Sequence, residues 1–132
     1  MPVSVNTIRV YPRKSETIDY SSLIFRLGIN QPINFETSEE TATIFKTLIA
    51  GGALKLLVDL TECPFIDSSG VGLLINSVKE IRKKNGEIVI LKSPSNVDSV
   101  IKLTNIDRII NTYENEDDAV EYLSFLNSNH EG

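Results

Sequence analysis

The stretch Val58 to Leu74, VDLTECPFIDSSGVGLL, joins an apolar strand to an amphipathic helix through a short polar loop. Residues 54–60, LKLLVDL, are mostly apolar, as is typical of a strand buried on both faces. We expect the helix to begin at Asp67-Ser68-Ser69-Gly70, because Asp and Ser side chains accept hydrogen bonds from the free N–H groups of a first turn. The stretch therefore predicts hydroxyl groups displayed at a helix N-terminus beyond the carboxyl end of a strand. Open α/β sheets tend to bind ligands in that region.

Strands alternate with helices on both sides of this stretch. The expected strands are residues 7–11, 23–27, 54–60, 87–92 and 108–113. Four helices are expected. The first follows a capping box at Thr37 and Glu40, and the second runs from about 69 to 84. The third opens at Ser93-Pro94, and the fourth follows a cap at Asn115. This order predicts an α/β fold, a mostly parallel or mixed sheet of about five strands with about four helices packed on it. The two early strands have no helix between them and are expected to form an antiparallel hairpin.

Apolar residues at helical spacing mark the helix faces that we expect in the core. They are Ile44, Phe45, Leu48 and Ile49 in the first helix, Val71, Leu74, Ile75, Val78 and Ile81 in the second, Val97, Val100, Ile101 and Leu103 in the third, and Ala119, Val120, Leu123 and Leu126 in the last. Gly51-Gly52 and Asn85-Gly86 supply the stops of the first two helices.

Length and charge limit the function classes. The 132 residues suit one domain over 1–132, with residues 1–21 as an extended N-terminal segment that holds the first strand and 127–132 as a polar tail. A net charge of -5 argues against nucleic acid as the main partner, because phosphate binding needs a clustered basic face. No apolar run approaches the roughly 20 residues that insert across a membrane. The first residues, MPVSVNTIRVYPRK, lack a signal-peptide core, so the expected location is the cytoplasm.

The sequence offers few groups for catalysis. Cys63 is the only cysteine, which rules out an internal disulfide and agrees with a reducing compartment; we expect it to pack at the sheet edge. His130 is the only histidine, so neither a histidine triad nor a multi-histidine metal site is expected. Gly70-Val71-Gly72 lacks the other glycines and the lysine of a nucleotide-binding loop. On the residues alone, DSSG is therefore either a capped helix start or an anion site, and no cofactor is expected.

Phe65 to Gly72, FIDSSGVG, preceded by Asp59-Leu60, resembles the signature of STAS domains and is most similar to bacterial anti-sigma-factor antagonists. The resemblance continues through Asn85-Gly86, the strand EIVIL, the short Pro94 helix and LTNIDRIINTYENEDDAV. It covers about residues 22 to 126 and implies the mixed sheet with packed helices that the pattern of elements predicts.

The resemblance also implies a regulatory function without catalysis. Unphosphorylated family members bind an anti-sigma factor that is also a serine kinase of the GHKL type, and sigma factor is thereby released. The kinase then phosphorylates the serine directly after the Asp, here Ser68, with Ser69 as the second choice, and the complex falls apart. A PP2C-type phosphatase reverses the reaction. The implied partner-binding residues are Asn34, Asp67, Ser68, Ser69, Gly70, Val71 and Gly72.

The second strand departs from the family pattern. The family usually carries G-x-[LI]-D after this strand, whereas here Gly28 is followed by INQPINF, about three residues longer. Asn34, with Asn30 as the second choice, stands where the Asp is expected. Two other functions stay open: a STAS scaffold or regulatory subunit of another complex, such as a stressosome or lipid-transport complex, and a small enzyme or nucleotide-binding protein. An intact DSSG favours the antagonist, and an enzyme would have only scattered carboxylates for its chemistry.

Overall fold

The computed structural model describes residues 2–8, 23–93 and 96–130. The strands are β1 (Val3–Ile8), β2 (Ile24–Ile29), β3 (Lys55–Asp59), β4 (Glu87–Leu91) and β5 (Asn111–Tyr113). The helices are α1 (Ser38–Ala50), α2 (Ser68–Arg82), α3 (Asn96–Leu103) and α4 (Glu116–His130), with a 3-10 helix, η2 (Ile106–Arg108), between α3 and β5. None of the described helices is long and apolar enough to cross a membrane.

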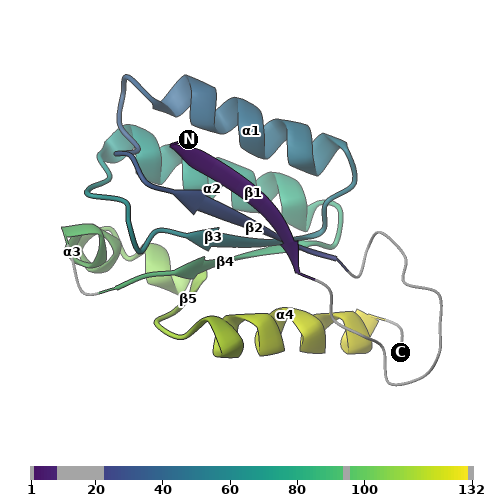
Figure 1. The fold of residues 1–132 in the computed structure, drawn as a ribbon. Coiled ribbons are helices and arrows are strands. Elements are labelled where there is room, and N and C mark those ends of the chain that lie inside the picture. Colours follow the sequence, from purple (N-terminus) through teal and green to yellow (C-terminus); the bar gives the residue numbers. More distant parts are fainter. Residues whose placement is uncertain (1, 9–22, 94–95, 131–132) are drawn as a thin grey trace.

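The strands form one mixed sheet in the order β1-β2-β3-β4-β5. β1 pairs antiparallel with β2, and the other three pairs are parallel. Helices α1 and α2 lie on one side of the sheet and α4 lies on the other (Figure 1). The α/β class, the mixed five-stranded sheet, the four helices and the antiparallel hairpin predicted from the sequence are all confirmed.

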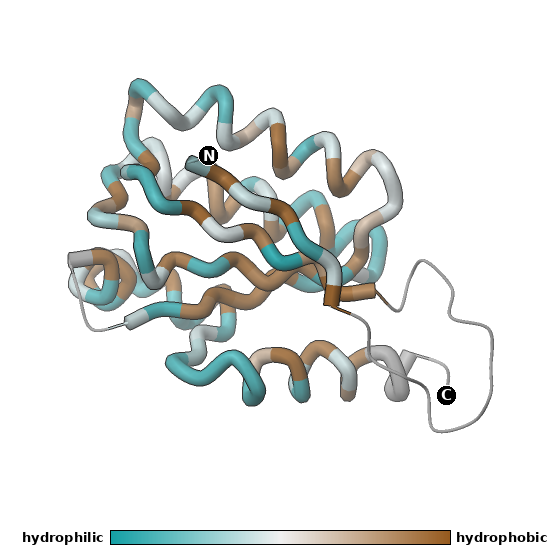
Figure 2. The backbone as a smooth tube through the Cα atoms, viewed as in Figure 1, coloured by the Kyte–Doolittle hydropathy of each residue, from teal (hydrophilic) through white to brown (hydrophobic). Residues whose placement is uncertain are grey.

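Apolar side chains fill both sides of the sheet. Every residue of β3 is buried, which explains why its sequence is nearly continuous in apolar residues. On the α1 and α2 side, the core includes Leu27, Phe45, Leu56, Val58, Leu74, Ile81, Ile88 and Ile90. On the α4 side, Ile24, Leu57, Val89 and Leu91 pack against Ala119 and Leu123. Figure 2 shows this arrangement as mostly hydrophobic inner strands between helices that alternate in hydropathy along their length.

The outer strands differ from the sequence prediction. β1 begins at Val3, four residues before the predicted strand at 7–11, and residues 9–11 lie outside the described part of the chain. Most β1 side chains are exposed, so burial imposes little apolar pattern on this edge strand. The last strand covers 111–113 and not 108–113. Asn105 adopts a left-handed φ of 57° and begins a 3-10 turn, which buries Ile106 and Ile110.

The helix predictions also need corrections. Leu103, expected in the core, is 83% exposed at the end of α3, while Val97 and Ile101 carry the buried face. The Thr37–Glu40 capping box does not form: the Thr37 hydroxyl oxygen accepts from the Asn34 N–H at 3.0 Å, and the hydroxyl donates to the carbonyl of Pro32. α2 ends at Arg82, two residues before the predicted end, and Asn85 adopts a left-handed φ of 65°.

The last helix is longer than predicted: α4 continues to His130, so residues 127–130 of the expected tail are helical. Pro94, in the predicted start of the third helix, lies outside the described residues. The Asn115 cap is confirmed by hydrogen bonds from the N–H groups of residues 117 and 118.

Candidate functional site

The start of α2 is capped by Asp67. Its backbone is extended, with φ -100° and ψ -170°, and its Oδ1 accepts hydrogen bonds from the N–H groups of Ser69 at 2.8 Å and Gly70 at 3.2 Å. An aspartate in this position satisfies free donors and places negative charge at the positive end of the helix dipole. Of the two residue types that the sequence offered as caps, the aspartate is therefore the one used, and Ser68 becomes the first helical residue.

Asp67 also joins this helix start to the loop that precedes α1. Its Oδ2 accepts a hydrogen bond from the N–H of Phe35 at 3.1 Å. Alongside, Ile33 and Ile66 form an isolated parallel bridge: the Ile33 N–H donates to Phe65 O at 3.1 Å, and the Asp67 N–H donates to Ile33 O at 3.2 Å. The loops 30–37 and 60–67 are thus held together as a short extension of the β2–β3 pairing. We call these two loops and the first turn of α2 the Ser68 face.

Ser68 is exposed on this face. Its hydroxyl forms no hydrogen bond with the described residues, so both its donor and its acceptor positions are open. Ser69 is half-buried one residue further along the helix. The geometry therefore makes the Ser68 oxygen the more accessible of the two for a reagent that approaches from solvent.

The two glycines of the motif differ in their surroundings. Gly70 is buried, and a Cβ there would lie 2.5 Å from Ile66 Cγ2 and even closer to the carbonyl oxygen of Ile33. At Gly72 a Cβ would meet nothing within 4 Å. A residue without a side chain lets another backbone approach closely. For Gly70 that backbone is the chain's own loop at Ile33, whereas Gly72 and half-buried Val71 remain partly open to solvent.

Asn34 organises the loop before α1. Its Oδ1 accepts hydrogen bonds from the N–H groups of Glu36 and Thr37, both at 3.0 Å, while its own N–H donates to the Thr37 hydroxyl at 3.0 Å. A carboxylate oxygen could accept the same two N–H groups, so an amide here can take over the capping task of an aspartate. A partner contact by Asn34 stays a prediction. Asn30 is exposed and donates its N–H to Pro2 O at 2.9 Å.

Phe35 and Phe65 are the residues of this face that sequence reasoning missed. The Phe35 side chain is 82% exposed and the Phe65 side chain is 42% exposed. Both stand in loops, outside any apolar periodicity of a helix or strand. An aromatic residue that no helix or strand pattern explains was the only signal available from the sequence.

An open polar depression lies beside this face, at the β1–β2 side of the sheet. Its volume is about 250 Å³, and its lining is Ser4, Arg26, Gly28, Ile29, Asn30, Asp59, Thr61 and Glu62. Arg26 bridges Asp59 and Glu116, and Asp59 also accepts from the Thr61 N–H at 2.9 Å. These contacts tie β2, β3 and the start of α4 together, so Asp59 has a structural task.

The Cys63 thiol is poorly placed for chemistry. Cys63 is buried in the core, and burial raises the pKa of its thiol, against the lowering effect of hydrogen bonds with the backbone of Ile33 and Phe65. A raised pKa keeps this thiol protonated and weakly reactive near neutral pH. No group of three or more His, Cys, Asp or Glu side chains within 2–8, 23–93 and 97–126 could hold a metal ion.

The chain is similar to known proteins over most of its length. The family model described as "STAS domain" matches residues 14–119. A Thermotoga maritima protein named "Putative anti-sigma factor antagonist" is 30% identical over 93 residues, which are 67% of this chain and 82% of that protein.

Solved structures agree with this likeness. A crystal structure of a Thermotoga maritima protein with the same description has a TM-score of 0.71 and 27% identity, over 76% of this chain and 86% of that one. The anti-sigma factor antagonist SpoIIAA in its unphosphorylated form has a TM-score of 0.61 over 81% of this chain and 93% of its own, and its 19% identity makes it a likeness of fold.

Proposed function

This chain belongs to the STAS domain family, and from that membership we propose that it is an anti-sigma factor antagonist that works as a phosphorylation switch. Its unphosphorylated form binds an anti-sigma factor that is also a GHKL-type serine kinase, and sigma factor is released. Phosphorylation of Ser68 ends the binding, and a PP2C-type phosphatase restores it. The observation that carries the proposal is the exposed, unengaged hydroxyl of Ser68, placed beside Asp67 within the segment that matches the family.

The local geometry suits a serine that gains and loses a phosphate. A phosphate adds roughly -1.5 to -2 charges and three acceptor oxygens. The N-terminal end of α2 favours an anion through its dipole and its N–H groups. The Asp67 carboxylate already accepts from the N–H groups of Ser69 and Gly70, and its charge repels a phosphate on the neighbouring residue. These effects oppose each other, so the phosphate changes the folded domain little.

The switch therefore acts where the partner touches the chain. A partner shaped around a small hydroxyl would have to bury a dianion without compensating charge, and burying an unpaired charge is costly. Asn34, Asp67, Ser69, Gly70, Val71 and Gly72 are the other residues that we propose for this contact, with Gly70 acting through the position of the Ile33 loop.

Phosphorylation at Ser68 is tested by mapping. Incubation with the GHKL-type serine kinase of the same organism and ATP is expected to label wild type at Ser68 and to leave Ser68→Ala unlabelled, because Ser69 is half-buried. Mass spectrometry of the peptides reads out the site, and Ser69→Ala serves as the matched control that keeps its label. Label found only on Ser69, or on neither serine, contradicts the assignment.

We further propose that the chain acts by binding and has no turnover of its own. Its relatives carry the name "Putative anti-sigma factor antagonist", which describes a regulator. Purified wild type is expected to hydrolyse ATP or GTP no faster than the Ser68→Ala, Asp67→Asn double variant, measured as phosphate release. Steady hydrolysis that disappears in the double variant would refute this.

A further inference from the structure

Two exposed aromatic side chains, those of Phe35 and Phe65, stand on the Ser68 face. Phe35 is the more exposed of the two, at 82%, and Phe65 is at 42%. Single exposed apolar residues are common on protein surfaces, so exposure alone means little. These two, however, come from the two loops that the Ile33–Ile66 bridge holds together, next to the same helix start.

The backbone that carries Phe35 is fixed. Its N–H donates to Asp67 Oδ2, the next N–H along the chain donates to Asn34 Oδ1, and its carbonyl accepts from the Ser38 hydroxyl at 3.3 Å. A residue whose backbone is already held by hydrogen bonds loses less backbone entropy when a partner binds it. Phe35 is therefore preorganised as an anchor, and the residue that positions it, Asp67, is the neighbour of Ser68.

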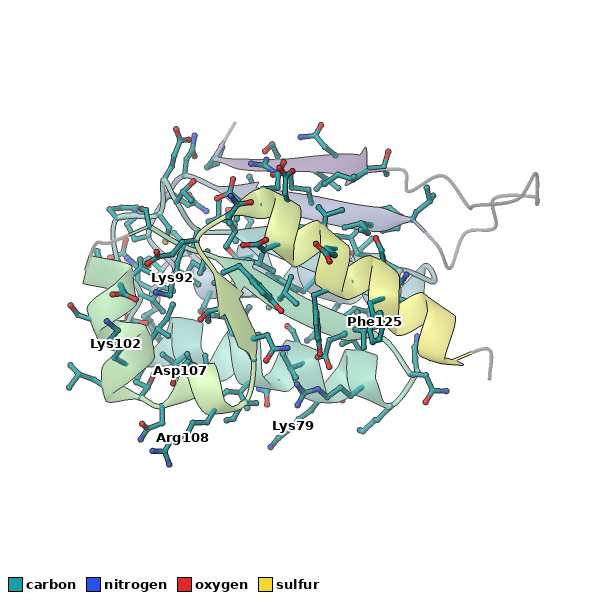
Figure 3. All side chains as sticks on the ribbon, turned by 90° about the horizontal axis from the view of Figure 1, so that it is seen from below. Lys79, Lys92, Lys102, Asp107, Arg108 and Phe125 are labelled. Atoms are coloured by element: carbon teal, nitrogen blue, oxygen red, sulfur yellow. The ribbon has the colours of Figure 1, made fainter. Side chains whose placement is uncertain are left out.

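The charge on this part of the surface has one sign. Residues 30–40 and 60–72 contain Glu36, Glu39, Glu40, Glu62 and Asp67 and no Lys or Arg, so they carry -5. The four glutamates are exposed, and two of them lie in the first turn of α1. The basic residues of α2, Lys79 and Arg82, lie in its last turn, at the other end of a helix roughly 20 Å long. Lys79 points into solvent there (Figure 3).

We propose that the Ser68 face docks on a basic protein surface with an apolar pocket that receives Phe35, and that this surface belongs to the kinase that phosphorylates Ser68. The inference rests on the proposed function and adds the chemistry of its interface. Complementary charge speeds the encounter and selects the partner, and a buried aromatic side chain at the centre supplies binding energy. Phe65 lines the rim of the contact.

Affinity measurements on matched phenylalanines test the anchor. The probe is the purified serine kinase of the same organism that labels Ser68, titrated by calorimetry with wild type, Phe35→Ala and Phe125→Ala. Phe125 is 62% exposed and lies on α4, on the other side of the sheet (Figure 3), so it controls for the loss of an exposed ring. Phe35→Ala is expected to weaken binding at least tenfold, whereas Phe125→Ala stays within about twofold. Thermal unfolding of both variants should match wild type.

Kinetics at two salt concentrations test the charge. The double variant Glu36→Gln, Glu39→Gln is expected to associate with the same kinase more slowly, and with a weaker dependence on salt, because the removed charges steer the encounter. Glu121→Gln, an exposed change on α4, is the control and should behave as wild type.

The outcomes separate this inference from the proposed function. If Ser68 is labelled and Phe35→Ala binds the kinase as well as wild type does, the anchor is wrong and the switch stands. If Phe125→Ala weakens binding equally, the effect is not specific to this face and the inference fails. If no GHKL-type kinase of the organism labels Ser68, both fail.

Discussion

Gly70→Ala is expected to destabilise the domain by about 3 kcal/mol, near the upper end for overpacking in a well-packed region. The added methyl group would overlap Ile66 Cγ2 and the carbonyl oxygen of Ile33. That carbonyl cannot retreat freely, because it accepts the N–H of Asp67 at 3.2 Å within the bridge between the two loops. For a domain of this size the change corresponds to a melting temperature lower by roughly 10 °C.

Gly72→Ala is the matched control, two residues along the same helix. Its methyl group meets nothing within 4 Å, and alanine is a better helix former than glycine by about 1 kcal/mol. We therefore expect Gly72→Ala to unfold at the same temperature as wild type or slightly above it. Thermal and urea unfolding of the three proteins make the comparison. Equal stability of the two variants would show that the Ile33 loop moves enough to accommodate a methyl group at residue 70.

Phosphorylated wild type is expected to bind the anti-sigma factor more than 100-fold more weakly than the unphosphorylated protein, a loss of about 3 kcal/mol. The reason is the burial of a dianion at a surface that accepts a hydroxyl. Ser68→Asp carries less charge and should lose at least tenfold, about 1.4 kcal/mol. Ser68→Ala should keep its affinity and resist inactivation by the kinase. Calorimetry with the purified anti-sigma factor gives all four values.

The same proteins, measured alone, show where the effect arises. The melting temperature of the phosphorylated protein and of Ser68→Asp should move by only a few degrees, since a change at a helix start is worth about 1 kcal/mol. Asp67, not Ser68, caps α2, so neither modification removes the cap. Unfolding of the free domain upon phosphorylation would mean that the switch is global and not confined to the interface. If the phosphorylated protein binds as tightly as the unphosphorylated protein, Ser68 does not lie in the interface.

The sequence predicted the parts of the fold that burial controls. β3 and β4 are buried on both faces and α2 has a strong apolar stripe, so their residues left a clear pattern. β1 was predicted four residues too late, because an exposed edge strand needs no alternation of apolar and polar residues. Leu103 was wrongly predicted to be buried, because helical spacing does not show where a short helix leaves the core. Ser77 is buried on α2 although its polarity kept it out of the predicted stripe.

The helix start at Asp67 and Ser68 was predicted in position, but its contacts with the loop before α1 were not. Asp67 as a cap and Ser68 at the helix start follow from local chemistry, which a sequence shows directly. The second arm of Asp67, to the N–H of Phe35, joins residues 32 positions apart and depends on the β2–β3 pairing. For the same reason the different tasks of Gly70 and Gly72 could be assigned only when the position of Ile33 was known.

The strand order of the sheet bears on how the domain forms during synthesis. Each strand pairs with the one made just before it, so no strand has to insert between two that are already paired. The sheet can therefore grow at one edge, each strand adding to the one made before it. Both loops of the Ser68 face come from the first 72 residues. The Ser68 face is thus built from the part of the sheet that is made first, whereas β4 and β5 extend the sheet at the other edge and α4 covers its other side.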